Sequence, residues 1–297
     1  MSTIVLTTSY PSFEGDPSGH FVRSEVDALR AESSESVQVL APPSWVTAFG
    51  WPGAAARVRQ NPLRLVGAAW WVAFVRRELK NRAPRRVVAH WAIPCGVAAA
   101  SVPLEQTRVP FELELVSHGA DVRFLRAMPA SIRARLVGHL LARASRWRFV
   151  SEALRDALAG VLPPASKDAL VAKSLIRAPL LQVDRPTDLP PRERDEKRLV
   201  WVGRLVPSKN LGRALEYVSC TQKDAHLVVV GDGPSRRALE REASSLGVRA
   251  SFVGKVPRPK ALAWIASADT LLMSSKAEGL STVVREAEAL GTPVLWV

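Results

Sequence analysis

Short β-rich runs alternate with helical segments along the chain, and this alternation limits the fold more than any other feature of the sequence. The expected strands are residues 3–8, 37–41, 87–91, 111–117 and 147–150 in the first half, and 199–203, 226–231, 250–253, 269–274 and 292–297 in the second. Strands separated by helices in this way are typical of parallel sheets with helices on both faces. The sequence therefore predicts an α/β fold with two doubly wound sheets.

Prolines and charged residues gather between residues 162 and 197, which is typical of a domain junction. We expect an N-terminal, acceptor-side Rossmann-like domain over residues 1–165, a linker over 166–198 and a donor-binding Rossmann-like domain over 199–297. A chain of 297 residues is long enough for two ordinary domains. Sheets that face each other across a cleft would bind ligands at the carboxyl ends of their strands.

Two glutamates lie close to one helix near the end of the chain. Ser281 or Thr282 can cap a helix over residues 282–290, and Gly291 is a usual C-terminal stop. Glu278 then lies in the loop ahead of the helix, and Glu286 lies about two turns inside it. The free N–H groups of a helix N-terminus suit a phosphate. From the residues alone, a solvated acidic helix face is the commoner explanation.

Two loops of the second half carry cations and glycines at strand ends. Arg204 and Lys209 lie five residues apart after the first strand, where they can clamp a diphosphate, although ordinary surface charge is also open. Gly231 and Gly233 follow the next strand and permit a tight turn and close ligand approach. A dinucleotide fingerprint is disfavoured because its third glycine is missing.

These segments together resemble the retaining glycosyltransferases of family 4, which have the GT-B fold. Residues 274–293 resemble the Glu-x7-Glu signature of that family, and residues 203–210 resemble its Gly-Arg-Leu…Lys-Asn segment. His118, Gly119 and Asp121 resemble its His-Gly-x-Asp loop. The chain departs from the family pattern at Ser274, Leu280 and Glu288, where Pro, Phe and Met are usual.

The resemblance implies that a sugar moves, with retention, from a UDP- or GDP-type donor to a glycan or lipid-linked acceptor. It assigns Arg204 and Lys209 to the donor diphosphate and Glu286 to the nucleotide ribose. It makes Glu278 and His118 the catalytic residues, in contact with the transferred sugar, and places His90 in the lining of the cleft. The other donor-binding residues that it implies are Gly19, Gly231, Gly233, Val253, Gly279, Leu280 and Ser281.

The sequence lacks the motifs of metal-dependent transfer and of serine hydrolases. The sequence has no Asp-x-Asp and no His or Cys pair at ligand spacing, so we expect transfer without a metal and without a cofactor. A Gly-x-Ser-x-Gly elbow is also missing.

Residues 172–179 lack the turn usual in the family, and family members continue with further elements after the last strand. We therefore expect the second domain to be incomplete, which leaves open a catalytically silent relative that binds a nucleotide or a partner protein.

The formal charge of +13 attracts anionic partners of several kinds. Residues 57–86 carry nine Arg or Lys against one Glu, with Trp70, Trp71 and Phe74 among them. An anionic membrane surface and a core-packed helix with a basic solvated end are about equally compatible with this segment, and Trp45, Phe49 and Trp51 in the preceding loop slightly favour the membrane. No nucleic-acid motif is present, so a nucleic-acid partner is disfavoured.

The N-terminus shows no signal peptide, and the two distant cysteines fit a reduced compartment. We therefore expect a cytoplasmic protein. If the basic segment binds lipid, the protein is peripheral on the inner face of the membrane.

Overall fold

The computed structural model describes residues 2–13, 15–16, 18–32, 36–49, 54–103, 105, 109–275 and 279–297, apart from the side chains of residues 55 and 56. The chain divides into two compact units. The N-terminal unit consists of Met1–Pro11 and Ser18–Leu180, and the C-terminal unit consists of Ser12–Pro17 and Leu181–Val297.

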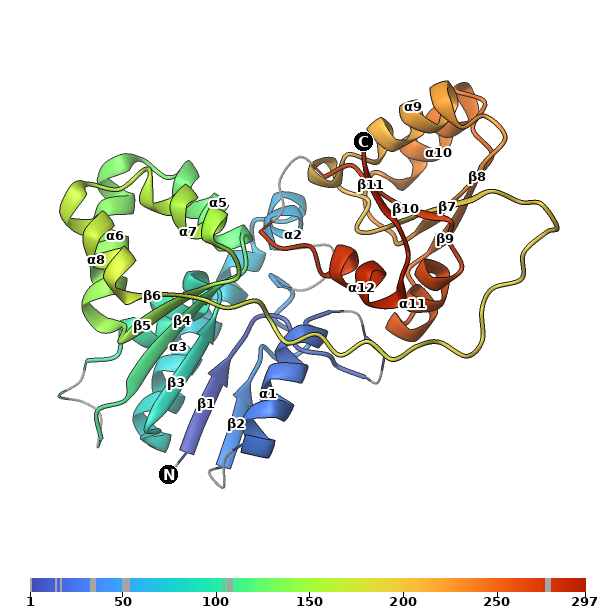
Figure 1. Ribbon diagram of the computed structural model, residues 1–297. Helices are drawn as coiled ribbons and strands as arrows, with labels where there is room; N and C mark the ends of the chain where they lie inside the picture. The colour runs from blue at the N-terminus through green and yellow to red at the C-terminus, as the bar shows by residue number, and fades with distance from the viewer. Residues whose placement is uncertain are drawn as a thin grey trace. The chain divides into compact units, whose positions relative to one another are not determined.

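The N-terminal unit is built on a six-stranded parallel sheet with the order β2-β1-β3-β4-β5-β6 (Figure 1). The strands are β1 (Ser2–Leu6), β2 (Ser36–Leu40), β3 (Arg86–His90), β4 (Glu112–Ser117), β5 (Arg146–Phe149) and β6 (Ser174–Ile176). The helices are α1 (His20–Glu32), α2 (Ala54–Gln60), α3 (Arg64–Arg82), the π-helical turn η1 (Ala92–Gly96), α4 (Val97–Ala100), α5 (Ala120–Ala127), α6 (Ala130–Arg143), α7 (Glu152–Ala159) and α8 (Pro164–Lys173).

The central strands of this sheet are buried on both faces, as parallel strands covered by helices must be. Consecutive residues Ile4, Val5 and Leu6 of β1 have no exposed surface. Val22 and Val26 of α1 pack with Val5 and its neighbours on one face of the sheet. The apolar runs that predicted strands are therefore continuous because both faces of the sheet contact helices.

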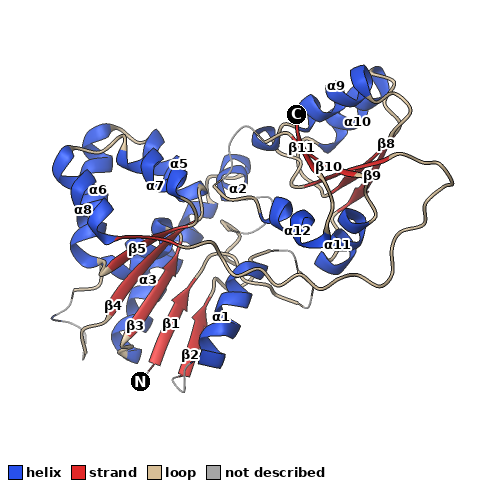
Figure 2. Cartoon of the chain, viewed as in Figure 1, coloured by secondary structure: helices blue, strands red, loops and turns tan. Residues whose placement is uncertain are grey.

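The C-terminal unit has a five-stranded parallel sheet with the order β11-β10-β7-β8-β9. Figure 2 draws its strands in red and its helices in blue. Its strands are β7 (Arg198–Val202), β8 (His226–Val230), β9 (Ala250–Gly254), β10 (Thr270–Met273) and β11 (Val294–Trp296). Its helices are the 3-10 turn η3 (Pro207–Lys209), α9 (Leu211–Thr221), α10 (Arg236–Ser245), α11 (Arg258–Ala266) and α12 (Thr282–Leu290).

Alternate residues of β7 contribute to two separate cores in this unit. Leu199 and Trp201 pack with buried residues of α9 and α10, whereas Val200 packs with buried residues of α11 and α12. The two helix layers therefore cover opposite faces of the sheet, since successive strand side chains point to opposite sides. The predicted α/β fold with two doubly wound sheets is confirmed.

The structure differs from the expected linker over residues 166–198. Helix α8 and strand β6 lie at its start, β6 pairs with β5, and the N-terminal unit extends to Leu180. Pro163 and Pro164 suggested a linker, but Pro164 is the first residue of α8, where a missing N–H leaves no hydrogen bond unmade. Residues 166–176 therefore belong to the N-terminal unit.

The sharp backbone turn at Gly231 provides a test of this fold. Gly231 has a φ of +134°, and a Cβ there would lie 1.8 Å from the carbonyl oxygen of Gly203. We expect Gly231→Ala to lower the free energy of unfolding of the C-terminal unit by about 3 kcal/mol or more, measured by urea denaturation. Gly138 in α6 has open space around it, so Gly138→Ala should be neutral or slightly stabilising. A Gly231→Ala variant as stable as the native chain would contradict this account.

Candidate functional site

The order of the C-terminal sheet places a topological switch point beside β7. The chain runs from β7 to β8 and β9 on one side, and then returns to β10 on the other. Ligands of open α/β sheets bind outside the carboxyl ends of the strands at such a point. The loops after β7 and β10 meet there, because the Ser274 hydroxyl donates a 3.1 Å hydrogen bond to the carbonyl oxygen of Lys209. Trp201 Nε1 donates to the same hydroxyl at 3.0 Å.

Arg204 and Lys209 lie on this loop, which the neighbouring loop holds by its backbone. The N–H of Leu205 donates to the carbonyl of Asp232 at 2.9 Å, and the N–H of Ser235 donates to the carbonyl of Leu205 at 3.1 Å. Lys209 ends the turn η3, and its own N–H donates to Val206 at 3.0 Å. The two cations are therefore carried by a loop with fixed backbone geometry.

Gly231 and Gly233 lie against the backbone of the neighbouring β7 loop. A Cβ at Gly231 would lie 1.8 Å from the carbonyl oxygen of Gly203, and one at Gly233 would lie 2.4 Å from that of Leu205. The sequence predicts a tight turn and close approach of a ligand at these glycines. In the structure they also permit close approach of the loop that carries Arg204, and their contact with a ligand stays a prediction.

Glu286 is a buried carboxylate on α12 with only 6% of its surface exposed. Arg258, the first residue of α11, donates from Nε to Glu286 Oε1 at 2.9 Å. Burial raises the pKa of Glu286, and the charge and hydrogen bond of Arg258 oppose that rise. Arg258 is a candidate site residue that the sequence analysis did not single out. Its signal was its place at a helix start, directly after Pro257 in the loop that follows β9.

Helix α12 begins and ends as the sequence predicted. The Ser281 hydroxyl accepts a hydrogen bond from the N–H of Val284, and Gly291 ends the helix in the left-handed conformation. Gly279 and Leu280 are half-buried and lead into the helix. Glu278, expected to be catalytic, lies outside the described residues. Val253 lies near the carboxyl end of β9 with 37% of its surface exposed.

In the N-terminal unit, His118 directly follows the carboxyl end of β4, and Gly119 separates it from α5. Its ring contacts those of Phe21, Trp91 and His90, with centroid distances of 4.8, 5.0 and 5.2 Å. His118 Nε2 and His90 Nδ1 are 3.0 Å apart, within hydrogen-bond distance. Because Phe21 belongs to the start of α1, the Gly19 loop reaches the same edge of this sheet as His118.

Two residues near these rings, Trp91 and Gly19, have a positive φ angle. Trp91 has a φ of 67°, which is strained for an aromatic residue. A Cβ at Gly19 would lie 2.1 Å from the carbonyl oxygen of Ser9. The close packing of this loop on Ser9 therefore requires glycine at residue 19. The buried Asp121 carboxylate accepts from the N–H groups of Ala92 and Gly119, at 2.9 and 3.1 Å. Asp121 thus joins the ends of β3 and β4 and fixes the loop that carries His118.

A chain of buried charges lies beside the histidine pair. Glu114 Oε1 lies 3.2 Å from Arg148 Nε, and Arg148 also pairs with Glu25. Glu25 Oε2 in turn lies 3.8 Å from His90 Nε2, which is longer than a hydrogen bond. Glu25, Glu114 and Arg148 are all less than 9% exposed. This network was not predicted because its members come from α1, β4 and β5, which lie far apart in the sequence.

Both histidines are neutral at pH 7. Burial, with the charge of Arg148, lowers the pKa of His90 to about 3. Burial, His90 and Arg148 hold the pKa of His118 well below its usual range. A neutral imidazole can both donate and accept a hydrogen bond, as recognition of a polar ligand requires. Among the residues that the structure describes, no three His, Cys, Asp or Glu side chains form a metal-binding group.

Residues 196–297 match the family described as glycosyl transferases group 1. A protein of Bacillus subtilis (strain 168), provisionally named teichuronic acid biosynthesis glycosyltransferase TuaC, is 30% identical over 79% of this chain and 58% of its own length. This chain thus spans little more than half of that relative. A GDP-mannose-dependent alpha-(1-6)-phosphatidylinositol monomannoside mannosyltransferase of Mycolicibacterium smegmatis is 26% identical, over 98% of this chain and 79% of its own.

Solved structures share the fold at low sequence identity. Anabaena HepE, crystallised with UDP-glucose, superimposes with a TM-score of 0.65 and 17% identity over 100% of this chain and 80% of its own. WaaG, a glycosyltransferase of lipopolysaccharide biosynthesis, gives a TM-score of 0.61 at 17% identity, with the same coverage.

The lowered pKa values of His90 and His118 predict a pH dependence of stability. Below about pH 6.5 the unfolded chain binds protons that the folded chain does not, so stability is complete above that pH and falls as the pH decreases. We expect the free energy of unfolding to fall between pH 6.5 and 5 by about 1 kcal/mol per pH unit for each histidine. Denaturant titration at several pH values measures this slope.

His90→Gln should remove its share of that slope, whatever it does to stability at pH 7. His139→Gln, at an exposed position of α6, is the matched control variant. A slope that His90→Gln leaves unchanged would contradict the burial of a neutral imidazole at this position.

The family match, the two parallel sheets and the solved structures of the same fold lead to one assignment. Residues 196–297 match the glycosyl transferases group 1 family, and the chain consists of two parallel-sheet α/β domains with the GT-B fold of the similar solved structures.

Proposed function

We propose that this chain is a retaining glycosyltransferase of family 4, which moves a sugar from a UDP- or GDP-linked donor to a glycan or lipid-linked acceptor. The observation that carries the proposal is the loop with Arg204 and Lys209, held at the switch point of the C-terminal sheet by Ser274 and Asp232. The names of similar proteins support the donor class, because HepE was crystallised with UDP-glucose and the Mycolicibacterium relative depends on GDP-mannose.

In this proposal the donor diphosphate binds between the β7 loop and the start of α12. Arg204 presents a planar fork that matches phosphate oxygens, and Lys209 adds a compact positive charge. The N-terminus of α12 adds backbone N–H groups and the positive end of a helix dipole. When the bond from the sugar to the diphosphate breaks, the electron pair moves to the leaving oxygen, where these groups stabilise the negative charge.

Glu286 and Arg258 form the part of the proposed site that holds the nucleotide ribose. Glu286 accepts from Arg258 at one oxygen, so the pair is oriented before a ligand binds. A carboxylate can accept hydrogen bonds from ribose hydroxyls without a change in its protonation. Arg258 therefore acts as a positioning residue for Glu286. Glu278 stays our proposal for the donor sugar.

His118 is proposed to contact the transferred sugar through its neutral ring. Its low pKa keeps the imidazole uncharged, so the ring can exchange hydrogen bonds with sugar hydroxyls. Asp121 and His90 hold the loop and the ring in place. Gly19, Gly231 and Gly233 contribute through the backbone shapes that they permit. Because Arg204 and Lys209 supply the positive charge, the proposed transfer needs no metal ion.

Two substitutions test the proposed donor site. We expect Lys209→Ala and Glu286→Gln each to lower kcat/KM for the donor by about 100-fold or more, because each removes a group that contacts the donor. Release of UDP or GDP from a panel of sugar nucleotides, with and without EDTA, measures the activity. Lys223→Ala and Glu288→Gln, at exposed positions of the same unit, are the matched controls.

Activity equal to that of the native chain in either site variant would contradict the proposal. Loss of activity in EDTA would contradict transfer without a metal. Nucleotide binding by the native chain without turnover of any donor would instead support the catalytically silent relative.

A further inference from the structure

The outward face of helix α3 changes character halfway along its length. On the inward side Trp71, Val75 and Leu79 are fully buried, at the spacing of one helix stripe. The opposite side of the same helix is apolar in its first half and basic in its second. Such a helix is not explained by packing within the N-terminal unit alone.

The apolar half of this face is unusually exposed. Leu63, directly before the helix, is 76% exposed, and Leu65 and Val66 are 54% and 70% exposed. Trp70 is 40% exposed and stacks on Phe74, while Trp45 meets Trp70 edge-on at a centroid distance of 4.3 Å. Contiguous apolar surface of this kind marks a site that binds a protein or a membrane.

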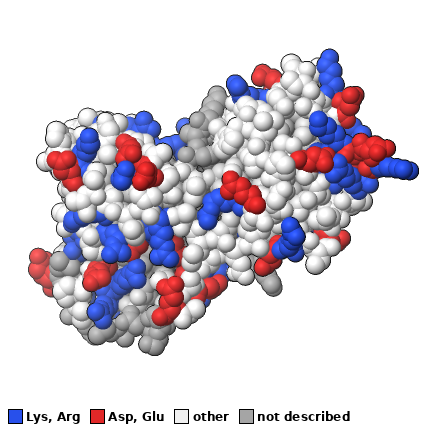
Figure 3. Space-filling view, viewed as in Figure 1, with Lys and Arg blue, Asp and Glu red and all other residues white. Residues whose placement is uncertain are grey.

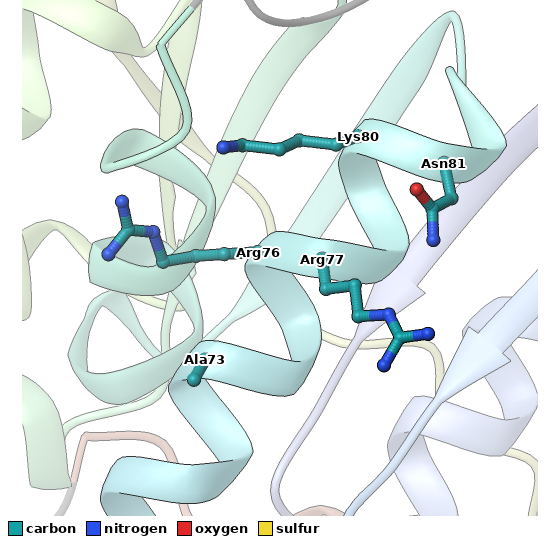
Figure 4. Close-up of a pocket in the computed structure, with 5 residues that line it drawn as sticks. All are labelled: Ala73, Arg76, Arg77, Lys80 and Asn81. Carbon is teal, nitrogen blue, oxygen red and sulfur yellow. The ribbon is translucent and has the colours of Figure 1, made fainter.

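The basic half begins one turn later. Arg76 and Lys80 project to one side of the helix and Arg77 and Asn81 to the other, and Ala73 lies on the preceding turn (Figure 4). Together they line a shallow groove of about 330 Å³. Glu78, the acidic residue of α3, forms an ion pair with Arg82 at 2.7 Å. By contrast, acidic and basic side chains are interspersed on the face that Figure 3 shows.

The apolar half and the basic half of this face together fit one class of partner. A second copy of the chain would bring another basic half and no counter-charge, which disfavours self-association through this face. An anionic lipid surface offers acyl chains at the headgroup boundary for the apolar half and phosphates for the basic half. We propose that the α3 face, defined as Leu63, Leu65, Val66, Trp70, Arg76 and Arg77, docks on an anionic membrane surface.

In this arrangement α3 lies in the plane of the membrane interface and does not cross it. No helix in the described part of the chain is long and apolar enough to span a bilayer. The apolar half enters the headgroup boundary, and Trp70 and Trp45 occupy the interfacial depth that tryptophan prefers. Arg76 and Arg77 then contact lipid phosphates.

Vesicle sedimentation of the full chain tests this inference without any sugar donor, so its result is independent of the proposed function. The native chain should bind vesicles of phosphatidylcholine with 30% phosphatidylglycerol, and pure phosphatidylcholine at least about tenfold more weakly. Arg76→Glu with Arg77→Glu should lower binding to the anionic vesicles at least about tenfold. Leu63→Ser with Val66→Ser should also lower it, and should leave a weak component that salt removes.

Arg237→Glu with Arg241→Glu is the matched control, because it makes the same change in net charge at exposed positions of α10. Binding that falls equally in this control would assign the attraction to net charge and overturn the inference. Equal binding to both vesicle types would also overturn it. A dimer in analytical ultracentrifugation that Leu63→Ser with Val66→Ser dissociates would overturn it as well, since the α3 face would then bind a second copy of the chain.

Discussion

The loop after β7 lies directly on the loop after β8, and the geometry of the C-terminal unit's site depends on this backbone contact. Glycine is required at residues 231 and 233 because carbonyl oxygens of the β7 loop occupy the space where side chains would begin. The hydrogen bonds from Leu205 to Asp232 and from Ser235 to Leu205 then fix the loop. Two cations on a fixed loop cost less entropy to bring to a diphosphate than two cations on a mobile one.

Ser274 connects the loop after β10 to the same β7 loop. Its hydroxyl is buried, accepts from Trp201 and donates to the Lys209 carbonyl, so it connects the loops on both sides of the switch point. A proline at position 274 could not provide the Trp201–Ser274–Lys209 connection, because it lacks a hydroxyl.

The N-terminal unit depends on a different kind of interaction. Glu25, Glu114 and Arg148 are charged groups in the interior, and burial of a charge costs free energy unless each charge is paired. Removal of one member leaves the other uncompensated, which typically costs about 3–5 kcal/mol. Burial is the main cause of the low pKa of His90, and the charge of Arg148 from this network lowers that pKa further. Arg148 thus contributes both to the paired charges of the interior and to the neutral state of His90.

Features with local causes could be predicted from the sequence. The two sheets follow from alternating apolar runs, and the limits of α12 follow from the cap at Ser281 and the stop at Gly291. Helix α8 was missed because its N-terminal prolines also suit a linker. The contact of Arg258 with Glu286 and the Glu25–Arg148 pair could not be found, because sequence spacing does not report contacts between distant elements.

The central claim is that the switch point of the C-terminal sheet holds a nucleoside diphosphate through its two phosphates. Isothermal titration of the full chain with UDP, GDP, uridine and guanosine, in EDTA, tests it most directly. The account predicts that at least one diphosphate binds and that its nucleoside binds about 100-fold more weakly, since charge-assisted hydrogen bonds to the phosphates are lost. A nucleoside that binds as tightly as its diphosphate, or a chain that binds neither, would contradict it.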